Sequence, residues 1–233
     1  MRLLVSVRSV DEAMAAARGG VDFIDLKEPG AGALGGLPIA TIRAIVAALG
    51  TRRIALPVSA TIGDVPMDRL DEILAQVSAV GCCGVDYVKV GIEPGPLAIG
   101  VLDELARCAW PVVPVFLADR GLDIRLLQHA CGLGFPAVMA DTADKASGSL
   151  LELVPRAELE RFVACGRAAG QLVGLAGALR LADAAALRAL GADFAGFRSA
   201  VCNGDRAAAL DPLRLRQLVV AMRGDNAMAT CGS

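Results

Sequence analysis

Three lysines are the residues of this chain whose type and placement best suit chemistry. Lys27, Lys89 and Lys145 are the only lysines among 23 basic residues, and the others are all arginines. Each lysine follows a short β-like run, at residues 21–26, 85–88 and 136–140. A lysine amine can lose its proton and act as a nucleophile, whereas a guanidinium group stays charged at working pH. Compositional bias that leaves three solvated lysines is the alternative explanation.

A lysine needs a particular environment before it becomes a nucleophile. A free lysine has a pKa of about 10.4, so the neutral amine is scarce near pH 7. A neighbouring ammonium group and partial burial lower that pKa. One amine could then form a Schiff base with a carbonyl substrate while another moves protons. Carboxylates such as Asp25 and Asp141 could orient the lysines and relay protons during carbinolamine dehydration.

The spacing of these residues predicts that they share one cavity. Side chains alternate between the two faces of a strand, so Asp25 and Lys27 point the same way. Lys145 follows Asp141 by four residues and can reach it if the loop turns helically. Charged residues beside apolar strands are costly unless they are paired. Ion pairs that merely close the end of the fold are the structural alternative.

The elements that must position these residues alternate regularly between strand and helix. The sequence predicts strands at 2–7, 21–26, 54–59, 85–90, 110–117, 136–140, 172–175 and 192–197. It predicts helices at 9–18, 38–50, 66–80, 96–107, 122–131, 155–169, 182–190 and 212–222, with a polar loop at 141–149. Eight such units in residues 1–223 predict an α/β fold, a single (β/α)8 TIM barrel, followed by a flexible C-terminal tail at 224–233. A doubly wound open sheet is the alternative, but no glycine follows the first strand.

Composition and motifs exclude several function classes. A net charge of −2 argues against nucleic acid and anionic membranes as partners. The longest uncharged run, 126–140, is too short and too interrupted to span a membrane, and charges follow the N-terminus at once, so we expect a cytoplasmic protein. A single histidine, His129, and the absence of a C-x-x-C pair argue against a zinc-dependent aldolase. Hydrolase-elbow and P-loop motifs are also missing. We therefore expect neither a metal nor a cofactor.

Small residues after the last two predicted strands indicate a phosphate site. In this fold, phosphate is often bound by the loops that follow strands seven and eight. Gly174 and Gly177 would let backbone N–H groups approach an anion, and Arg198, next to Ser199, could add a charge-assisted hydrogen bond. Tight barrel packing is the other use for such small residues.

Four motifs together resemble the (5-formylfuran-3-yl)methyl phosphate synthase family of methanofuran biosynthesis. They are residues 25–36 (DLKEPGAGALGG), 87–91 (YVKVG), 141–145 (DTADK) and 197–202 (FRSAVC). The resemblance covers nearly the whole chain, and the first motif is the most specific. The family occurs in methanogens and methylotrophic bacteria, and an alanine- and arginine-rich composition fits a bacterium better.

The resemblance implies a lyase of the class I aldolase type, a carbon–oxygen lyase acting on phosphates. Such an enzyme condenses two molecules of glyceraldehyde 3-phosphate, releases phosphate and water, and closes a furan ring. By motif, Lys27 resembles the Schiff-base lysine and Lys89 the proton-transfer lysine. Asp25, Asp141 and Lys145 match other polar active-site positions.

Two other functions stay open at this point. One is a different Schiff-base aldolase acting on a phosphorylated sugar, of the deoxyribose-phosphate type. The other is an inactive barrel that serves as a binding or scaffold partner. The apolar outer helices also leave a homo-oligomer open.

Overall fold

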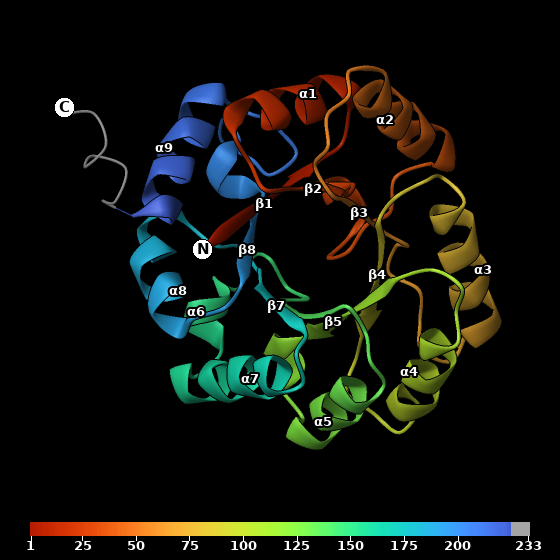
Figure 1. The fold of residues 1–233 in the computed structure, drawn as a ribbon. Coiled ribbons are helices and arrows are strands. Elements are labelled where there is room, and N and C mark those ends of the chain that lie inside the picture. Colours follow the sequence, from red (N-terminus) through yellow and green to blue (C-terminus); the bar gives the residue numbers. More distant parts are fainter. Residues whose placement is uncertain (225–233) are drawn as a thin grey trace.

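A computed structural model describes residues 1–224 as a closed barrel of eight parallel strands surrounded by helices (Figure 1). The strands are β1 (Arg2–Val7), β2 (Phe23–Leu26), β3 (Val58–Thr61), β4 (Tyr87–Ile92), β5 (Val112–Leu117), β6 (Ala137–Asp141), β7 (Leu172–Leu175) and β8 (Phe194–Phe197). They pair in sequence order, and β8 closes on β1. The predicted (β/α)8 barrel is therefore confirmed, and the open-sheet alternative is wrong. The predicted tail lies outside the described residues, apart from Gly224.

Helices follow the strands and pack around the barrel. They are α1 (Val10–Gly19), α2 (Ile39–Thr51), α3 (Leu70–Gly81), α4 (Ala98–Ala106), α5 (Ile124–Gly132), α6 (Leu150–Leu153), α7 (Arg156–Ala168), α8 (Ala184–Leu190) and α9 (Pro212–Arg223). In the described part of the chain, none of them combines the length and apolar character that crossing a membrane requires.

Two differences from the predicted elements have clear physical reasons. The third strand begins at Val58 rather than at residue 54, because Pro57 has no N–H for the ladder and the Ile54 N–H closes the end of α2 on Leu49 O at 3.1 Å. The short helix α6 lies directly after the predicted polar loop. At its start the Ser149 N–H donates to Glu152 Oε2 at 2.8 Å, which is one half of a capping box; this Ser-x-x-Glu spacing is a signal that the sequence contains and that our prediction overlooked.

Apolar side chains fill the barrel interior below the C-terminal ends of the strands. Leu4, Val113, Val115, Met139 and Phe194 form a buried cluster there, separate from the larger core between strands and helices. Each such side chain contributes about 1.5–3 kcal/mol when fully buried. This packing leaves only the C-terminal ends of the strands for polar groups.

Strand register places the polar residues in layers. Ser6 on β1 pairs with Asp25 on β2, and Asp25 pairs with Ser59 on β3. Thr61 and Lys89 are partners on β3 and β4. Residues at matching register positions on neighbouring strands point the same way. The register therefore brings Asp25 between two hydroxyl groups inside the barrel.

Candidate active site

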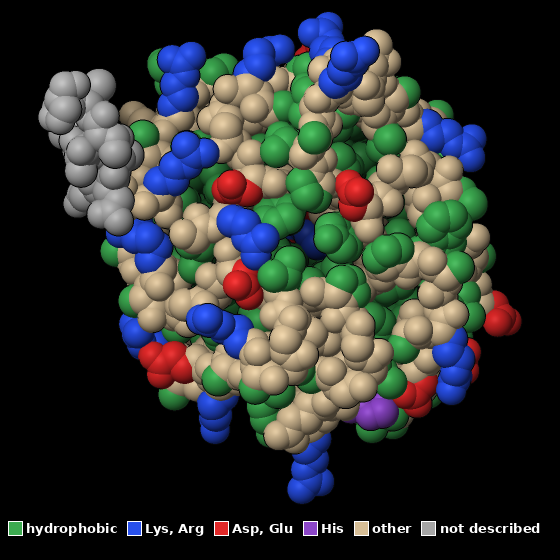
Figure 2. Space-filling view, in the orientation of Figure 1, with side chains coloured by type: hydrophobic (Ala, Val, Ile, Leu, Met, Phe, Trp, Pro, Cys, Tyr) green, Lys and Arg blue, Asp and Glu red, His purple; other side chains and the backbone are tan. Residues whose placement is uncertain are grey.

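A pocket at the C-terminal mouth of the barrel contains all five residues that the sequence predicted to be catalytic. Asp25, Lys27, Lys89, Asp141 and Lys145 line it, above a floor that Leu4 and Met139 help to form. Basic and acidic side chains border the hollow at the centre of the barrel in Figure 2. The alternation of strand side chains and the four-residue spacing thus place these groups as expected.

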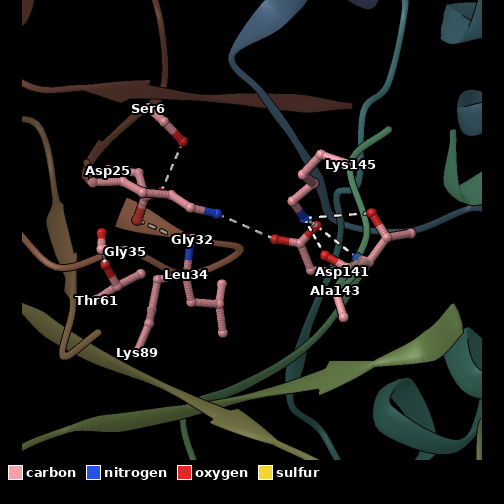
Figure 3. A network of polar contacts seen from close by, with 12 residues as sticks. Ser6, Asp25, Gly32, Leu34, Gly35, Thr61, Lys89, Asp141, Ala143 and Lys145 are labelled. Atoms are coloured by element: carbon pink, nitrogen blue, oxygen red, sulfur yellow. Dashed lines mark hydrogen bonds and ion pairs between the residues drawn. The ribbon is translucent and has the colours of Figure 1, made fainter. Parts of the chain in front are cut away.

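The first half of the site is centred on Asp25, which is 1% exposed. Lys89 Nζ lies 2.9 Å from its Oδ1, and the Ser59 hydroxyl donates to the same oxygen at 2.6 Å. The Ser6 hydroxyl donates to Oδ2 at 2.9 Å, and Figure 3 shows it pointing toward the carboxylate. Burial acts to raise the pKa of Asp25, but Lys89 and Lys27 outweigh it and hold that pKa below its usual value. Asp25 is therefore a fixed carboxylate that orients Lys89.

The second half of the site is centred on Asp141 at the end of β6. Lys27 Nζ lies 3.4 Å from Oδ2, and Lys145 Nζ contacts Oδ1 and the Thr142 carbonyl oxygen. Figure 3 shows this contact between Lys145 and Asp141. Burial acts to raise the pKa of Asp141, but Lys145 and Lys27 lower it to about 2. One carboxylate is therefore shared by two lysines, and its single negative charge compensates only one of their two positive charges.

Lys27 has the most suitable amine for nucleophilic attack. Burial lowers its pKa to about 8; the ammonium groups of Lys145 and Lys89 add to this, while Asp141 and Asp25 oppose it. With that pKa, about a quarter of the amine is neutral at pH 7.5, against roughly one in a thousand for a free lysine. Its 3.4 Å contact with Asp141 is also looser than the 2.9 Å pair of Lys89 and Asp25.

The loop after β7 borders the pocket with its backbone. Gly177 and Ala178 line the pocket, and both lie in the left-handed region, with φ of +115° and +44°. A Cβ on Gly177 would come within 2.8 Å of the Thr142 side chain, so only glycine fits there. Ser199, after β8, also lines the pocket. These positions agree with the predicted phosphate loops.

Gly174 does not reach the pocket, contrary to the sequence prediction. It lies within β7, and a Cβ at this position would be 2.3 Å from ring atoms of Phe194. Its small size serves the packing of the barrel interior, which was the alternative use of these small residues. Gly177 is three residues further along and lies where the strand has already ended.

Arg198 lines the pocket but is committed to structural contacts. Its buried guanidinium pairs with Glu12 at 2.6 Å and also donates to three carbonyl oxygens, those of Ser6, Arg206 and Ala208. These contacts occupy all five of its N–H groups. Burial acts to raise the pKa of Glu12, but Arg198 outweighs it and keeps the carboxyl ionised. Arg198 thus ties the loop after β8 to α1, and the predicted phosphate contact would require breaking this network.

Sequence reasoning missed three residues of the site. Ser6 and Ser59 are hydroxyl residues facing inward on otherwise apolar strands, and their register opposite Asp25 was the signal for them. Arg206 also lines the pocket, and nothing in its local pattern distinguishes it from other surface arginines. Residues 1–224 contain no group of three or more His, Cys, Asp or Glu side chains placed to hold a metal ion.

Known proteins resemble this chain over most of its length. A family model described as 4-HFC-P synthase matches residues 3–219. A Methylorubrum extorquens protein provisionally named (5-formylfuran-3-yl)methyl phosphate synthase is 39% identical over 223 residues, which cover 95% of this chain and 92% of that protein. The (5-formylfuran-3-yl)methyl phosphate synthase of Methanosarcina mazei is 32% identical, with 94% and 98% covered.

Solved structures show the same fold at lower identity. Phosphoribosyl anthranilate isomerase from Thermus thermophilus superposes with a TM-score of 0.66 at 18% identity, covering 96% of this chain and 98% of that one. A 3-hexulose-6-phosphate synthase superposes with a TM-score of 0.61 at 22% identity, covering 94% and 100%. These structures show the fold, whereas the family match over residues 3–219 and the sequence relatives show the family. The chain belongs to the 4-HFC-P synthase family.

Proposed function

We propose that this protein is a (5-formylfuran-3-yl)methyl phosphate synthase of methanofuran biosynthesis, a lyase that joins two molecules of glyceraldehyde 3-phosphate through a Schiff base on Lys27. The observation that carries the proposal is the buried amine of Lys27, whose pKa is lowered to about 8 at the mouth of a barrel. The names of the relatives support the proposed identity of the product.

The covalent chemistry starts at Lys27. Its neutral Nζ attacks the carbonyl carbon of a triose phosphate and forms a carbinolamine, which loses water to give the imine. Imine formation makes the adjacent carbon acidic, so a base can remove its proton and generate the carbon nucleophile for the second triose. Aldol addition, phosphate elimination and ring closure then follow without an oxidant: two trioses give the furan, one orthophosphate and two waters.

Lys89 is the proposed proton carrier. It lines the same pocket, is 4% exposed and is held by Asp25 at 2.9 Å. Ser6 and Ser59 fix the carboxylate that holds it. An amine fixed in this way can return to one position after each transfer, which suits a reaction with several proton steps.

The phosphate of a bound triose is proposed to lie against the backbone at Gly177 and Ala178 and beside Ser199. Gly177 and Ala178 both line the pocket with positive φ, and consecutive backbone N–H groups in such turns can form a concave anion site. Gly174 and Arg198 have no part in this proposal, because the structure uses both for packing and ion pairing.

Incubation with glyceraldehyde 3-phosphate alone tests the function. We expect a furan aldehyde absorbing in the near ultraviolet and inorganic phosphate in equal amount. Aldol products without phosphate release would instead support a Schiff-base aldolase for another phosphorylated sugar. The Lys27→Arg variant is the matched control, because it keeps the charge and removes the releasable amine. Equal turnover in both proteins would rule out the Schiff base on Lys27, and no product from either would leave only the scaffold alternative.

A further inference from the structure

Five basic side chains line the pocket, and four of them have a carboxylate partner. Lys27 and Lys145 share Asp141, Lys89 pairs with Asp25, and Arg198 pairs with Glu12. Arg206 is the exception: among residues 1–224 it has no carboxylate oxygen within 4.0 Å. The single hydrogen bond of its side chain runs from Nη2 to the carbonyl oxygen of Gly32, at 3.4 Å.

The main chain at Arg206 is held firmly although its side chain is not. Its carbonyl oxygen accepts from Arg198 Nε at 2.7 Å, and Arg198 Nη2 donates to Ala208 O at 2.7 Å. The Ala208 N–H closes a turn on Asp205 O at 2.9 Å. All N–H groups of Arg198 are taken up by these contacts and by Glu12. Arg198 therefore fixes the backbone at Arg206, from which the Arg206 side chain extends over the pocket.

The place of Arg206 explains what its guanidinium could bind. It follows β8, and the carbonyl that it contacts follows β2, so its side chain crosses the mouth above β1, the strand that pairs with both. Ser199 and Gly177 line the same pocket. A long hydrogen bond to a neutral carbonyl costs little to break, and a guanidinium can bind phosphate through two parallel N–H groups.

We propose that Arg206 binds a substrate phosphate at the pocket mouth, exchanging its contact with Gly32 for the phosphate oxygens and closing over the bound triose. The inference rests on the proposed function, in which two phosphorylated trioses enter one pocket. A phosphate removed from water needs a compensating cation; the three lysines here are each in contact with Asp25 or Asp141, whereas the guanidinium of Arg206 has no carboxylate contact among residues 1–224. Arg206 is thus a specificity residue for phosphorylated over unphosphorylated trioses.

The test compares Arg206→Gln, Arg206→Lys and, as a matched control, Arg43→Gln, which removes an exposed arginine on α2. Calorimetric titration with inorganic phosphate measures anion binding without turnover. We expect Arg206→Gln to weaken or remove binding of at least one phosphate and to lower kcat/KM for glyceraldehyde 3-phosphate roughly 10–100-fold, mainly through KM. The phosphate affinity and kcat/KM of Arg206→Lys should lie between those of wild type and Arg206→Gln. Arg43→Gln should match wild type.

Borohydride trapping of unphosphorylated glyceraldehyde separates binding from structural damage. The yield of adduct at Lys27 should be the same in wild type and Arg206→Gln, because this triose has no phosphate group for Arg206 to bind. Wild-type phosphate affinity and KM in Arg206→Gln, or an equal loss with unphosphorylated glyceraldehyde, would overturn the proposal. If wild type itself formed no adduct, the proposed function would fail, while phosphate titration would still report on Arg206.

Discussion

Removing the positive charge of Lys145 should make Lys27 harder to deprotonate. Both amines contact the same carboxylate of Asp141, and the ammonium of Lys145 helps to lower the pKa of Lys27 to about 8. Two unit charges about 6 Å apart repel by roughly 0.7–2.8 kcal/mol for an effective dielectric constant between about 80 and 20. That repulsion corresponds to roughly 0.5–2 pKa units. Removing a like charge favours the protonated amine, so the pKa of Lys27 should rise to about 9 in Lys145→Gln.

The pH dependence of adduct formation measures this shift directly. The initial rate of cyanoborohydride-trapped adduct at Lys27 should have a midpoint near pH 8 in wild type. In Lys145→Gln the midpoint should move up by about one unit, so the rate at pH 7.5 falls roughly 8-fold and recovers above about pH 9.5. Lys145→Arg keeps the charge and should keep the wild-type midpoint. An unmoved midpoint in Lys145→Gln, or the same shift in Lys145→Arg, would refute the reasoning.

Three further predictions follow from the contacts of single residues. Lys89→Arg should still form the Lys27 adduct but lose turnover, because a guanidinium cannot pass on its proton at working pH; adduct yield and phosphate release check this, and normal turnover would remove the proposed role of Lys89. Gly177→Ala should destabilise the fold by about 1–3 kcal/mol, since φ is +115° and Thr142 lies in the way; urea unfolding measures it, with Gly132→Ala, where nothing lies within 4 Å of the added Cβ, as a near-neutral control. Glu12→Gln should cost about 3 kcal/mol in the same assay, because it leaves the buried Arg198 without a carboxylate; an unchanged urea midpoint would show that the pair does not hold the loop.

The fold was predictable because strand and helix signals alternate along the whole chain. Pro57 shows where such reasoning fails: the residues before it look like a strand, yet they close the preceding helix. The shared position of the candidate catalytic residues was predictable for a similar reason. Alternation along β2 fixes Asp25 and Lys27 on one face, and parallel strands end at a common rim.

The proposed phosphate-binding residues were harder to predict, because contacts between distant segments decide which side chains are available. Gly174 and Gly177 look equivalent in the sequence, but only the position of the Phe194 ring makes the first a packing residue. Arg198 looks available until Glu12, 186 residues away in the sequence, is brought against it. Arg206 can be recognised as a candidate only from the structure, because the structure shows that each of the other four basic side chains in the pocket has a carboxylate partner.

Lys27 is the residue that we propose becomes covalently bound to substrate. Borohydride reduction of the protein with glyceraldehyde 3-phosphate, followed by peptide mass spectrometry, tests it most directly. We expect a reduced triose phosphate adduct on the peptide that carries Lys27, and no such adduct in Lys27→Arg. An adduct on Lys89 or Lys145 in wild type, or no adduct during active turnover, would contradict it.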